Sequence, residues 1–194
     1  MMSVRKLILL VVFALTFTSY NAKKSNAVKI IAVVGESVIT DIDAEDFTEI
    51  LCLMQNTKQC NKQSIFPMSV MTLVEANIKA EHMSKLGIND TDFKKSYTEY
   101  KKNVLKQVKL NNKINKEQFD WYLFTEYKWN AIVSSMLRDT KITDNDVKSF
   151  QNKNKNLKLS KEQAYNVLFN KKMEEKSRSL VNEAKKYYLV DIKI

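Results

Sequence analysis

The chain is poor in the residues that form tight turns. It has 2 glycines and 1 proline among 194 residues, far below the usual contents of about 7% and about 5%. Such a chain makes few sharp turns, so most of it must lie in helices joined by polar loops. We therefore expect a mainly α-helical fold.

Residues for catalysis and metal binding are also scarce. His82 is the single histidine, and it lies within a predicted helix with no cysteine and no obvious acidic residue to complete a catalytic triad, so we interpret it as a surface helix residue. The acidic segment 41–46 lacks the central glycine and the distal glutamate of a calcium loop. No glycine-rich phosphate loop is present. These absences predict a protein that is not an enzyme and has no metal or cofactor.

Arginine is rare among the basic residues. Lysine and arginine total 32, of which only Arg5, Arg138 and Arg178 are arginines. Nucleic-acid recognition favours arginine forks in a clustered basic patch, whereas these lysines are spread along the whole sequence. The composition therefore indicates a solvated basic surface and no nucleic-acid partner.

The first residues have the order of a secretory signal peptide. Basic residues precede an apolar run of 11 residues, 7–17, and a polar, small-residue segment ends at Ala27. A helix that spans a bilayer needs about 20 apolar residues. We therefore expect cleavage after Ala27, with Ala22 as a second candidate and an uncleaved anchor as the alternative. The mature chain, 28–194, then carries 28 basic and 22 acidic residues, a net charge of +6.

Export would place the two cysteines in an oxidising compartment. Cys52 is expected near the end of the first helix and Cys60 in the polar loop 55–64, so a bond between them would close that loop. A pair of free thiols is the alternative, and the spacing is not that of a C-x-x-C redox motif. We predict a disulfide between Cys52 and Cys60 and no oxidoreductase activity.

Five segments begin with a capping residue followed three positions later by an acidic or amide residue, the pattern of a helix start. A sixth helix is expected to begin near Ser64 or Pro67, with the proline in its first turn, and to end at Gly87. The five start pairs are Thr40/Asp43, Asn89/Asp92, Asn115/Gln118, Thr143/Asp146 and Ser160/Gln163.

Short extended segments are predicted at both ends of the mature chain. The β-branched run 28–34, the turn Gly35-Glu36 and the segment 37–40 form a hairpin. Residues 190–194 alternate between apolar and polar side chains, as a half-buried strand does. Because a lone two-stranded hairpin is marginally stable in water, we expect the last strand to join it as a third member.

The two long helices predicted in the second half differ in their apolar patterns. The helix from Asn115 has six aromatic residues within 11 positions, and Trp121, Phe124 and Tyr127 lie outside the stripe that contains Trp129. Such a helix is either buried on all sides or offers a face to a partner. The helix from Ser160 instead has one apolar stripe at helical spacing, made of Ala164, Val167, Leu168, Leu180, Val181, Ala184 and Tyr187.

Three stretches form a pattern when they are taken in order: "KIIAVVGESVITDIDAEDF", "FTEYKWNAIVSSMLRDTKITDNDVKSF" and "AYNVLFNKKMEEKSRSLVNEAKKYYLVDIKI". The second has Trp129, Leu137 and Arg138 in a W-x-x-[IL]-[IV]-x-x-x-L-R arrangement. The three stretches resemble parts of the SurA family of Gram-negative periplasmic chaperones. They look like its opening strand-turn-strand-helix, the helix that ends its N-terminal domain, and its far C-terminal helix and strand.

The resemblance implies a chaperone module without its enzyme. In that family, one or two parvulin-type prolyl isomerase domains lie between the second and third of these stretches, where this chain has only the mostly polar segment 151–159. We therefore expect a signal peptide at 1–27 and a chaperone domain at 28–150. After the linker at 151–159, a C-terminal helix and strand at 160–194 are expected to complete that same domain.

The expected function is that of a periplasmic chaperone that holds unfolded secreted chains in an apolar groove. By resemblance, its clients are chiefly outer-membrane β-barrel precursors. Methionine repacks around varied partners, although each such side chain could simply fill the core. The alternative is a structural or adaptor protein, tethered by an uncleaved 7–17 segment and bound to one folded partner. The predicted peptide-binding residues are Met68, Met71, Trp121, Phe124, Tyr127 and Trp129.

Overall fold

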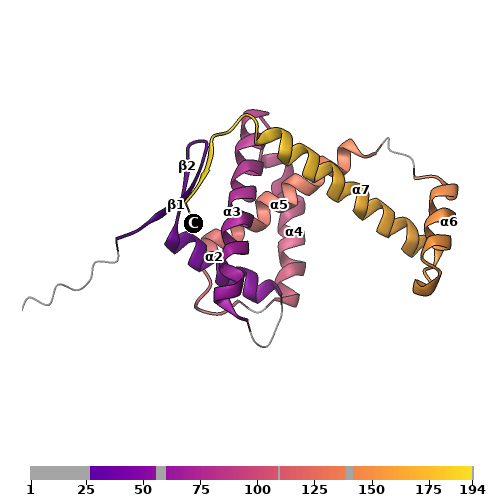
Figure 1. Cartoon of the computed structure of the whole chain (residues 1–194), viewed down its shortest axis with the longest axis horizontal. Coiled ribbons are helices and arrows are strands. Elements are labelled where there is room, and N and C mark those ends of the chain that lie inside the picture. Colours follow the sequence, from indigo (N-terminus) through magenta and orange to yellow (C-terminus); the bar gives the residue numbers. More distant parts are fainter. Residues whose placement is uncertain (1–26, 56–59, 109, 139–141, 194) are drawn as a thin grey trace, which may run out of the picture.

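The computed structural model describes residues 27–55, 60–108, 110–138 and 142–193. The predicted signal peptide therefore lies, up to its last residue, outside the described residues. Figure 1 shows a helical body with a small sheet on one side, so the predicted mainly α-helical fold is confirmed. The elements are β1 Ile30–Val34, β2 Ser37–Thr40, α2 Asp41–Met54, α3 Lys62–Lys85, α4 Thr91–Gln107, α5 Lys116–Met136, α6 Asp144–Lys153, the 3-10 turn η1 Lys155–Leu157, α7 Lys161–Ala184 and β3 Val190–Ile192.

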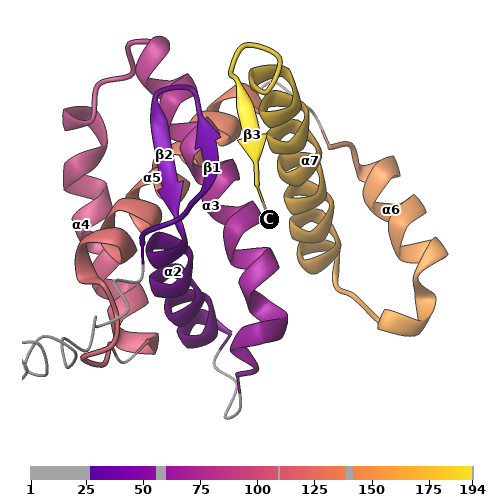
Figure 2. The same cartoon turned by 60° about the vertical axis from the view of Figure 1, so that its left-hand side comes forward.

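The last strand joins the first hairpin, as the sequence predicts. The sheet has the order β2-β1-β3, and β1 pairs antiparallel with both neighbours: Val34 lies opposite Ser37 on one side and opposite Val190 on the other. Gly35 turns the hairpin with a φ of 57°, which glycine adopts without steric cost. Figure 2 shows the three strands side by side, with α3 behind them. The C-terminal strand thus closes the sheet that the N-terminal segment begins.

Three of the five predicted helix starts are complete capping boxes. Thr40, Thr143 and Ser160 each accept a bond from the backbone N–H three residues on, and that third residue bonds back to the cap. Asn115 also caps its helix by accepting from the Gln118 N–H at 3.1 Å. The Gln118 side chain does not return to the cap, because it donates to a carbonyl of α2 at 2.9 Å.

The predicted cap at Asn89 is wrong by one residue. Helix α4 begins at Thr91, and its N-cap, Asp90, makes no side-chain capping bond. The Asp90 carboxylate instead accepts from Lys128 of α5 at 2.5 Å. Asn89 accepts only from the Thr91 N–H, at 3.0 Å. A tertiary ion pair has thus replaced the local cap.

Helix α3 begins earlier than predicted. Asn61 caps it by accepting from the Ser64 N–H, so Pro67 lies inside the helix rather than in its first turn. The end at Gly87 is as predicted: Gly87 has a φ of 66° and donates to the Ser84 carbonyl at 2.9 Å. This left-handed terminus is a common way of ending a helix.

The core lies where α2, α3, α5 and the C-terminal half of α7 meet under the sheet. Helix α3 packs against all the other elements of this group and against β1. No helix in the described part of the chain is long and apolar enough to cross a membrane. The largest fully buried apolar side chains of this core are Trp129, Phe47, Phe119, Ile50, Ile78, Met83, Val34, Val70, Val74 and Val133.

Helix α7 changes partners along its length. Its C-terminal half packs on α3 and α5, while its N-terminal half packs on α6 and projects from the body. We call residues 144–172, which comprise α6, η1 and the first half of α7, the arm. The predicted single stripe is therefore only partly buried: Ala164 and Val181 are buried, but Val167 is exposed. Tyr187, the last residue of the predicted stripe, lies beyond the end of α7 and is also exposed.

The predicted linker is mostly an ordered helical connection. Residues 151–153 belong to α6, and η1 follows after one residue. The Gln151 side chain donates to the Leu159 carbonyl at 2.9 Å, and Lys158 takes a left-handed φ of 46° to enter α7. The connection between α6 and α7 is therefore short and ordered.

Candidate peptide-binding surface

Helix α5 divides its aromatic residues between the core and the surface. Phe119 and Trp129 point into the core, and Trp129 is only 2% exposed. Trp121 lies on another face and is 36% exposed, with Phe124 and Tyr127 half-buried near it in the sequence. The predicted division between one buried stripe and a second aromatic face is therefore present in the structure.

Helix α4 supplies aromatic residues that complete this second face. The Tyr97 ring lies 4.8 Å from the Phe124 ring in an edge-to-face arrangement, and the Tyr100 ring lies 4.9 Å from the Tyr127 ring. We call these four residues the aromatic cluster. Such ring pairs contribute about 0.5–1.5 kcal/mol beyond their buried area, so the cluster fixes α4 against α5.

Two hollows lie on either side of Trp121 and Phe124. Both residues line both hollows, so the two rings form the wall that the hollows share. The first hollow, between α4 and α5, is lined in addition by Lys94, Tyr97, Thr98, Lys101, Lys116, Glu117 and Asp120. The second, at the end of α3, is lined in addition by Ala80, Met83, Ser84, Gly87, Ile88, Asn89, Asp90, Thr125 and Lys128.

Three residues that line the first hollow are bonded to one another: Tyr97, Lys101 and Asp120. The Tyr97 hydroxyl donates to the Asp120 carboxylate at 2.5 Å, and the Lys101 ammonium lies 2.6 Å from the same carboxylate. Burial, followed by the bond to Asp120, raises the pKa of Tyr97. Burial opposes ionisation of Asp120, but the bonds from Lys101 and Tyr97 outweigh it and lower the pKa of Asp120. The carboxylate therefore stays ionised and holds the tyrosine in place.

An ion pair holds the wall of the second hollow. The largely buried Lys128 side chain bonds to Asp90 in the loop before α4, and its ammonium lies 5.5 Å from the centre of the Phe124 ring. A cation at that distance is attracted by the face of the ring. Lys128 thus fixes both the loop and Phe124.

Trp129 does not lie on this surface. Its prediction as a peptide-binding residue is therefore wrong. Its indole N–H donates to the Ser177 hydroxyl of α7 at 2.8 Å, and the Lys79 ammonium lies 6.0 Å from its ring. Lys79 is itself held by Glu126 at 2.8 Å. Trp129 therefore joins α5 to α7 within the core, where a peptide from solution cannot reach it.

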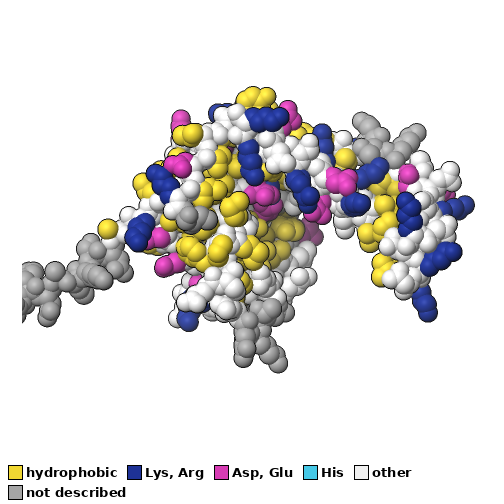
Figure 3. Space-filling model, viewed as in Figure 1, with side chains coloured by type: hydrophobic (Ala, Val, Ile, Leu, Met, Phe, Trp, Pro, Cys, Tyr) yellow, Lys and Arg dark blue, Asp and Glu magenta, His cyan; other side chains and the backbone are white. Residues whose placement is uncertain are grey.

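The predicted methionines lie apart from the aromatic surface. Met68 and Met71 are 44% and 48% exposed on α3, but neither lines either hollow. The methionine that does line a hollow is Met83, which is buried. Figure 3 shows other hydrophobic side chains gathered over the body below α7 and along the inner side of the arm. The structure thus brings together Trp121, Phe124 and, through the aromatic cluster, Tyr127.

His82 is less exposed than predicted. It is half-buried, and its ring lies 6.3 Å from the Trp129 ring and 6.5 Å from the Tyr188 ring. It therefore packs where α3, α5 and the C-terminal segment meet. Among the described residues, no group of three or more His, Cys, Asp or Glu side chains is placed to hold a metal ion.

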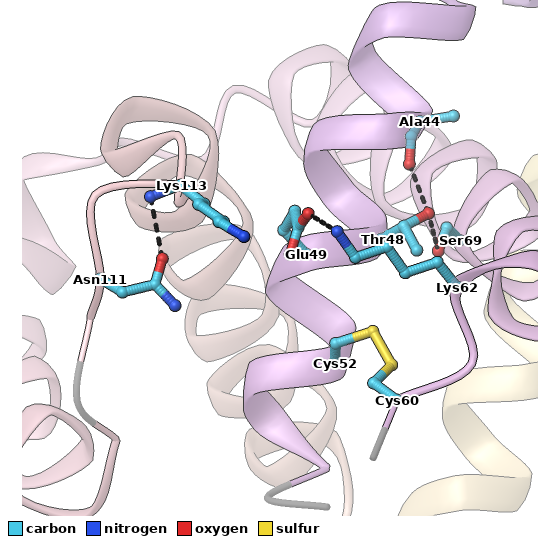
Figure 4. Close-up of polar contacts among 9 residues, drawn as sticks. All are labelled: Ala44, Thr48, Glu49, Cys52, Cys60, Lys62, Ser69, Asn111 and Lys113. Carbon is cyan, nitrogen blue, oxygen red and sulfur yellow. Dashed lines mark hydrogen bonds and ion pairs between the residues drawn. A yellow bond between two sulfur atoms is a disulfide. The ribbon is translucent and has the colours of Figure 1, made fainter. Parts of the chain in front are cut away.

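Cys52 and Cys60 are joined by a disulfide with Cα atoms 5.6 Å apart (Figure 4). The bond links the end of α2 to the segment that enters α3. Beside it, the Thr48 hydroxyl bonds to the Ala44 carbonyl at 2.7 Å and to the Ser69 hydroxyl at 2.9 Å. The α2–α3 pair is therefore held by covalent and polar contacts as well as by apolar packing.

Sequence reasoning missed the contribution of α4 to the site. Phe93, Tyr97, Tyr100 and Val104 recur at spacings of four, three and four residues, which places them on one face of a helix. That pattern would have predicted an aromatic face for α4.

Comparison with known proteins finds no match: no family model matches the chain, and no curated protein matches it.

Proposed function

We propose that this protein is a non-catalytic chaperone that holds unfolded secreted chains. The observation that carries the proposal is the wall formed by Trp121 and Phe124, which presents aromatic surface to a hollow on each side. Apolar side chains such as Met83 and Ile88 lie beside it. Two adjacent hollows that share an aromatic wall suit an extended peptide, because side chains two positions apart lie on the same face of such a peptide and can enter neighbouring sites.

The energetics favour weak, reversible binding. Docking one aromatic client residue removes roughly 100–200 Å² of apolar surface, which is worth a few kcal/mol at about 25 cal/mol/Å². Ordering the client and losing its translational freedom offset most of that gain. Affinities in the micromolar range follow, and a chaperone that must release its client requires such affinities.

The charges around the first hollow favour acidic clients. Lys94, Lys101 and Lys116 line it against Glu117 and Asp120. Salt screens exposed charges over about 10 Å at 0.1 M. Binding of acidic peptides should therefore weaken at moderate salt, while binding of neutral aromatic peptides should change little.

Cell location and client class rest on the sequence. The signal-peptide pattern and the resemblance to the SurA family support a periplasmic location, with outer-membrane β-barrel precursors as the chief clients. The resemblance also supports a single chaperone domain, with the parvulin insertion absent between α6 and α7. A prolyl isomerase assay should accordingly give no activity above background.

Peptide titration followed by tryptophan fluorescence tests the proposal. In a Trp129→Phe variant the remaining tryptophan is Trp121, so an aromatic-rich peptide that docks there should shift its emission to the blue with a micromolar Kd. In the otherwise unmodified chain, Phe124→Ser should weaken peptide binding about tenfold, whereas Tyr187→Ser, which removes an exposed aromatic in the segment after α7, should not change it.

Two results would count against this function. An unchanged Trp121 emission at saturating peptide would show that the hollows do not take clients. Recovery of one stoichiometric folded partner in a pull-down, with no peptide binding, would favour the tethered adaptor instead.

A further inference from the structure

The net positive charge of the mature chain is concentrated on the arm. Residues 28–194 carry 28 basic and 22 acidic residues, a net charge of +6. The arm, residues 144–172, contains seven lysines and three acidic residues, Asp144, Asp146 and Glu162, which gives +4. The much longer remainder of the mature chain therefore carries only +2. The seven lysines are Lys148, Lys153, Lys155, Lys158, Lys161, Lys171 and Lys172.

These lysines lie on a projecting, solvated surface. All are exposed except Lys172, which is half-buried, and Figure 3 shows basic side chains gathered at the far end of the arm. Lys161 pairs with Asp144 at 2.9 Å and Lys171 lies 3.9 Å from Glu175. At the tip, Lys153, Lys155 and Lys158 follow one another across the α6–α7 turn.

Apolar side chains are exposed among the same lysines. Leu157 lies in the turn between Lys155 and Lys158 and is 55% exposed, and Tyr165 and Val167 are exposed on the first turns of α7. Lysine stems cover apolar surface while their ammonium groups stay in water. Basic residues together with exposed apolar side chains are typical of surfaces that lie at the boundary of an anionic membrane.

We propose that the tip of the arm docks on the surface of an anionic lipid bilayer. The lysines would bind lipid phosphate groups, and Leu157 would enter the region between headgroups and acyl chains. Nucleic acid fits less well, because the arm has no arginine to form paired contacts with phosphate and exposed leucine adds nothing to a phosphate backbone. An acidic protein segment would likewise not require Leu157.

Docking through the tip would leave the peptide-binding surface free. No residue that lines either hollow belongs to the arm, and α7 meets the body through its other half. The arm would thus hold the body at a membrane surface while the hollows stay open. This inference does not depend on client binding, and the two are tested by separate variants.

Vesicle co-sedimentation of the full chain tests the docking. The probes are vesicles of phosphatidylcholine alone and vesicles that also contain phosphatidylglycerol. Basic residues flank the apolar run 7–17 and would also favour anionic vesicles, so the contribution of the tip is measured as the difference between the unmodified chain and the tip variants, which all keep that segment. The expected result is that anionic vesicles bind the chain at least tenfold more strongly than neutral ones and that salt removes the difference.

Matched variants locate the effect. A triple change at the tip, Lys153→Gln, Lys155→Gln and Lys158→Gln, should lower the affinity for anionic vesicles about a hundredfold, since each basic residue near an anionic surface contributes roughly a factor of five. The same loss of charge on α4, through K95Q, K102Q and K106Q, should change it less than threefold. Leu157→Ser alone should weaken binding a few-fold.

Three outcomes would overturn the proposal. Equal binding to neutral and anionic vesicles is the first, and equal losses in the tip and α4 variants are the second. The third is that the unmodified chain binds a DNA oligonucleotide or a polyglutamate peptide, the triple change at the tip abolishes that binding, and neither chain binds vesicles. All substituted positions are exposed, and circular dichroism of each variant checks that the fold is retained.

Discussion

At the scale of single residues, the two tryptophans have opposite roles although they are eight positions apart on one helix. Trp129 is buried and bonded to Ser177, whereas Trp121 lies at the wall between the hollows. Two helical turns separate the residues, but their angular positions differ enough to place one in the core and the other at the surface.

The stabilities of two variants should differ accordingly. Trp129→Ala leaves a cavity and an unpaired Ser177, so it should lower the free energy of unfolding by about 3–5 kcal/mol. Trp121→Ser removes a partly exposed ring and should cost less than about 1 kcal/mol. Urea denaturation at 25 °C measures both, and similar losses would show that Trp121 also belongs to the core.

Asp120 gives the stability a defined pH dependence. The pKa of Asp120 is lower in the folded protein than the ordinary value of 3.8, because the bonds from Lys101 and Tyr97 outweigh its burial. A lowered folded-state pKa adds stability that is complete at neutral pH and is lost as the pH falls from about 4 downward. The stability advantage of the unmodified chain over D120N should therefore shrink between pH 6 and pH 3, as measured by urea denaturation at each pH. An advantage that is constant with pH would contradict this role.

How far the sequence predicts single residues depends on whether their partners are local. The second aromatic face of α5 follows from spacing alone, and Trp121, Phe124 and Tyr127 are on it. The positions of His82 and Trp129 depend on α7 and on the C-terminal segment, which pack against them from about 50 to 100 residues away in the sequence. No local pattern carries that information.

At the scale of elements, short-range signals predict the helix boundaries well. The capping boxes at Thr40, Thr143 and Ser160 and the glycine end at Gly87 all use contacts within five residues. The predicted cap at Asn89 is wrong because Lys128, 38 residues away, binds the neighbouring Asp90. Local capping was thus overridden where a tertiary ion pair competes for the same side chain.

The disulfide should stabilise the pairing of α2 with α3. It closes a loop between positions eight apart in the sequence, and a loop of that length is worth about 2–3 kcal/mol through the lower entropy of the unfolded chain. A Cys52→Ser, Cys60→Ser variant should lose about that much free energy of unfolding. If alkylation without prior reduction labels both cysteines of the purified protein, the two thiols are free and this prediction fails.

At the scale of the whole molecule, the C-terminal segment completes the fold in two ways. Strand β3 pairs with β1, and the second half of α7 packs on α3 and α5. Period-2 alternation predicts the strand, and the instability of a lone hairpin predicts its partner. The arm was not predicted, because α7 has a continuous helical pattern and nothing in that pattern marks where its packing partner changes.

The molecule therefore has two separate surfaces with different chemistry. The aromatic wall lies on the body between α4, α5 and the end of α3, and the lysine-rich tip lies at the end of the arm. Substitutions at one surface should leave the other unaffected, because sites without shared contacts usually behave additively. This separation makes client binding and membrane docking independently testable.

The most direct test of the proposed chaperone function is suppression of aggregation. An unfolded outer-membrane β-barrel protein is diluted from urea into buffer with the chain at tens of micromolar, and light scattering is followed. We predict that the unmodified chain and Tyr187→Ser suppress scattering equally, and that a double variant, Trp121→Ser with Phe124→Ser, does not. No suppression by the unmodified chain, or full suppression by the folded double variant, would contradict the account.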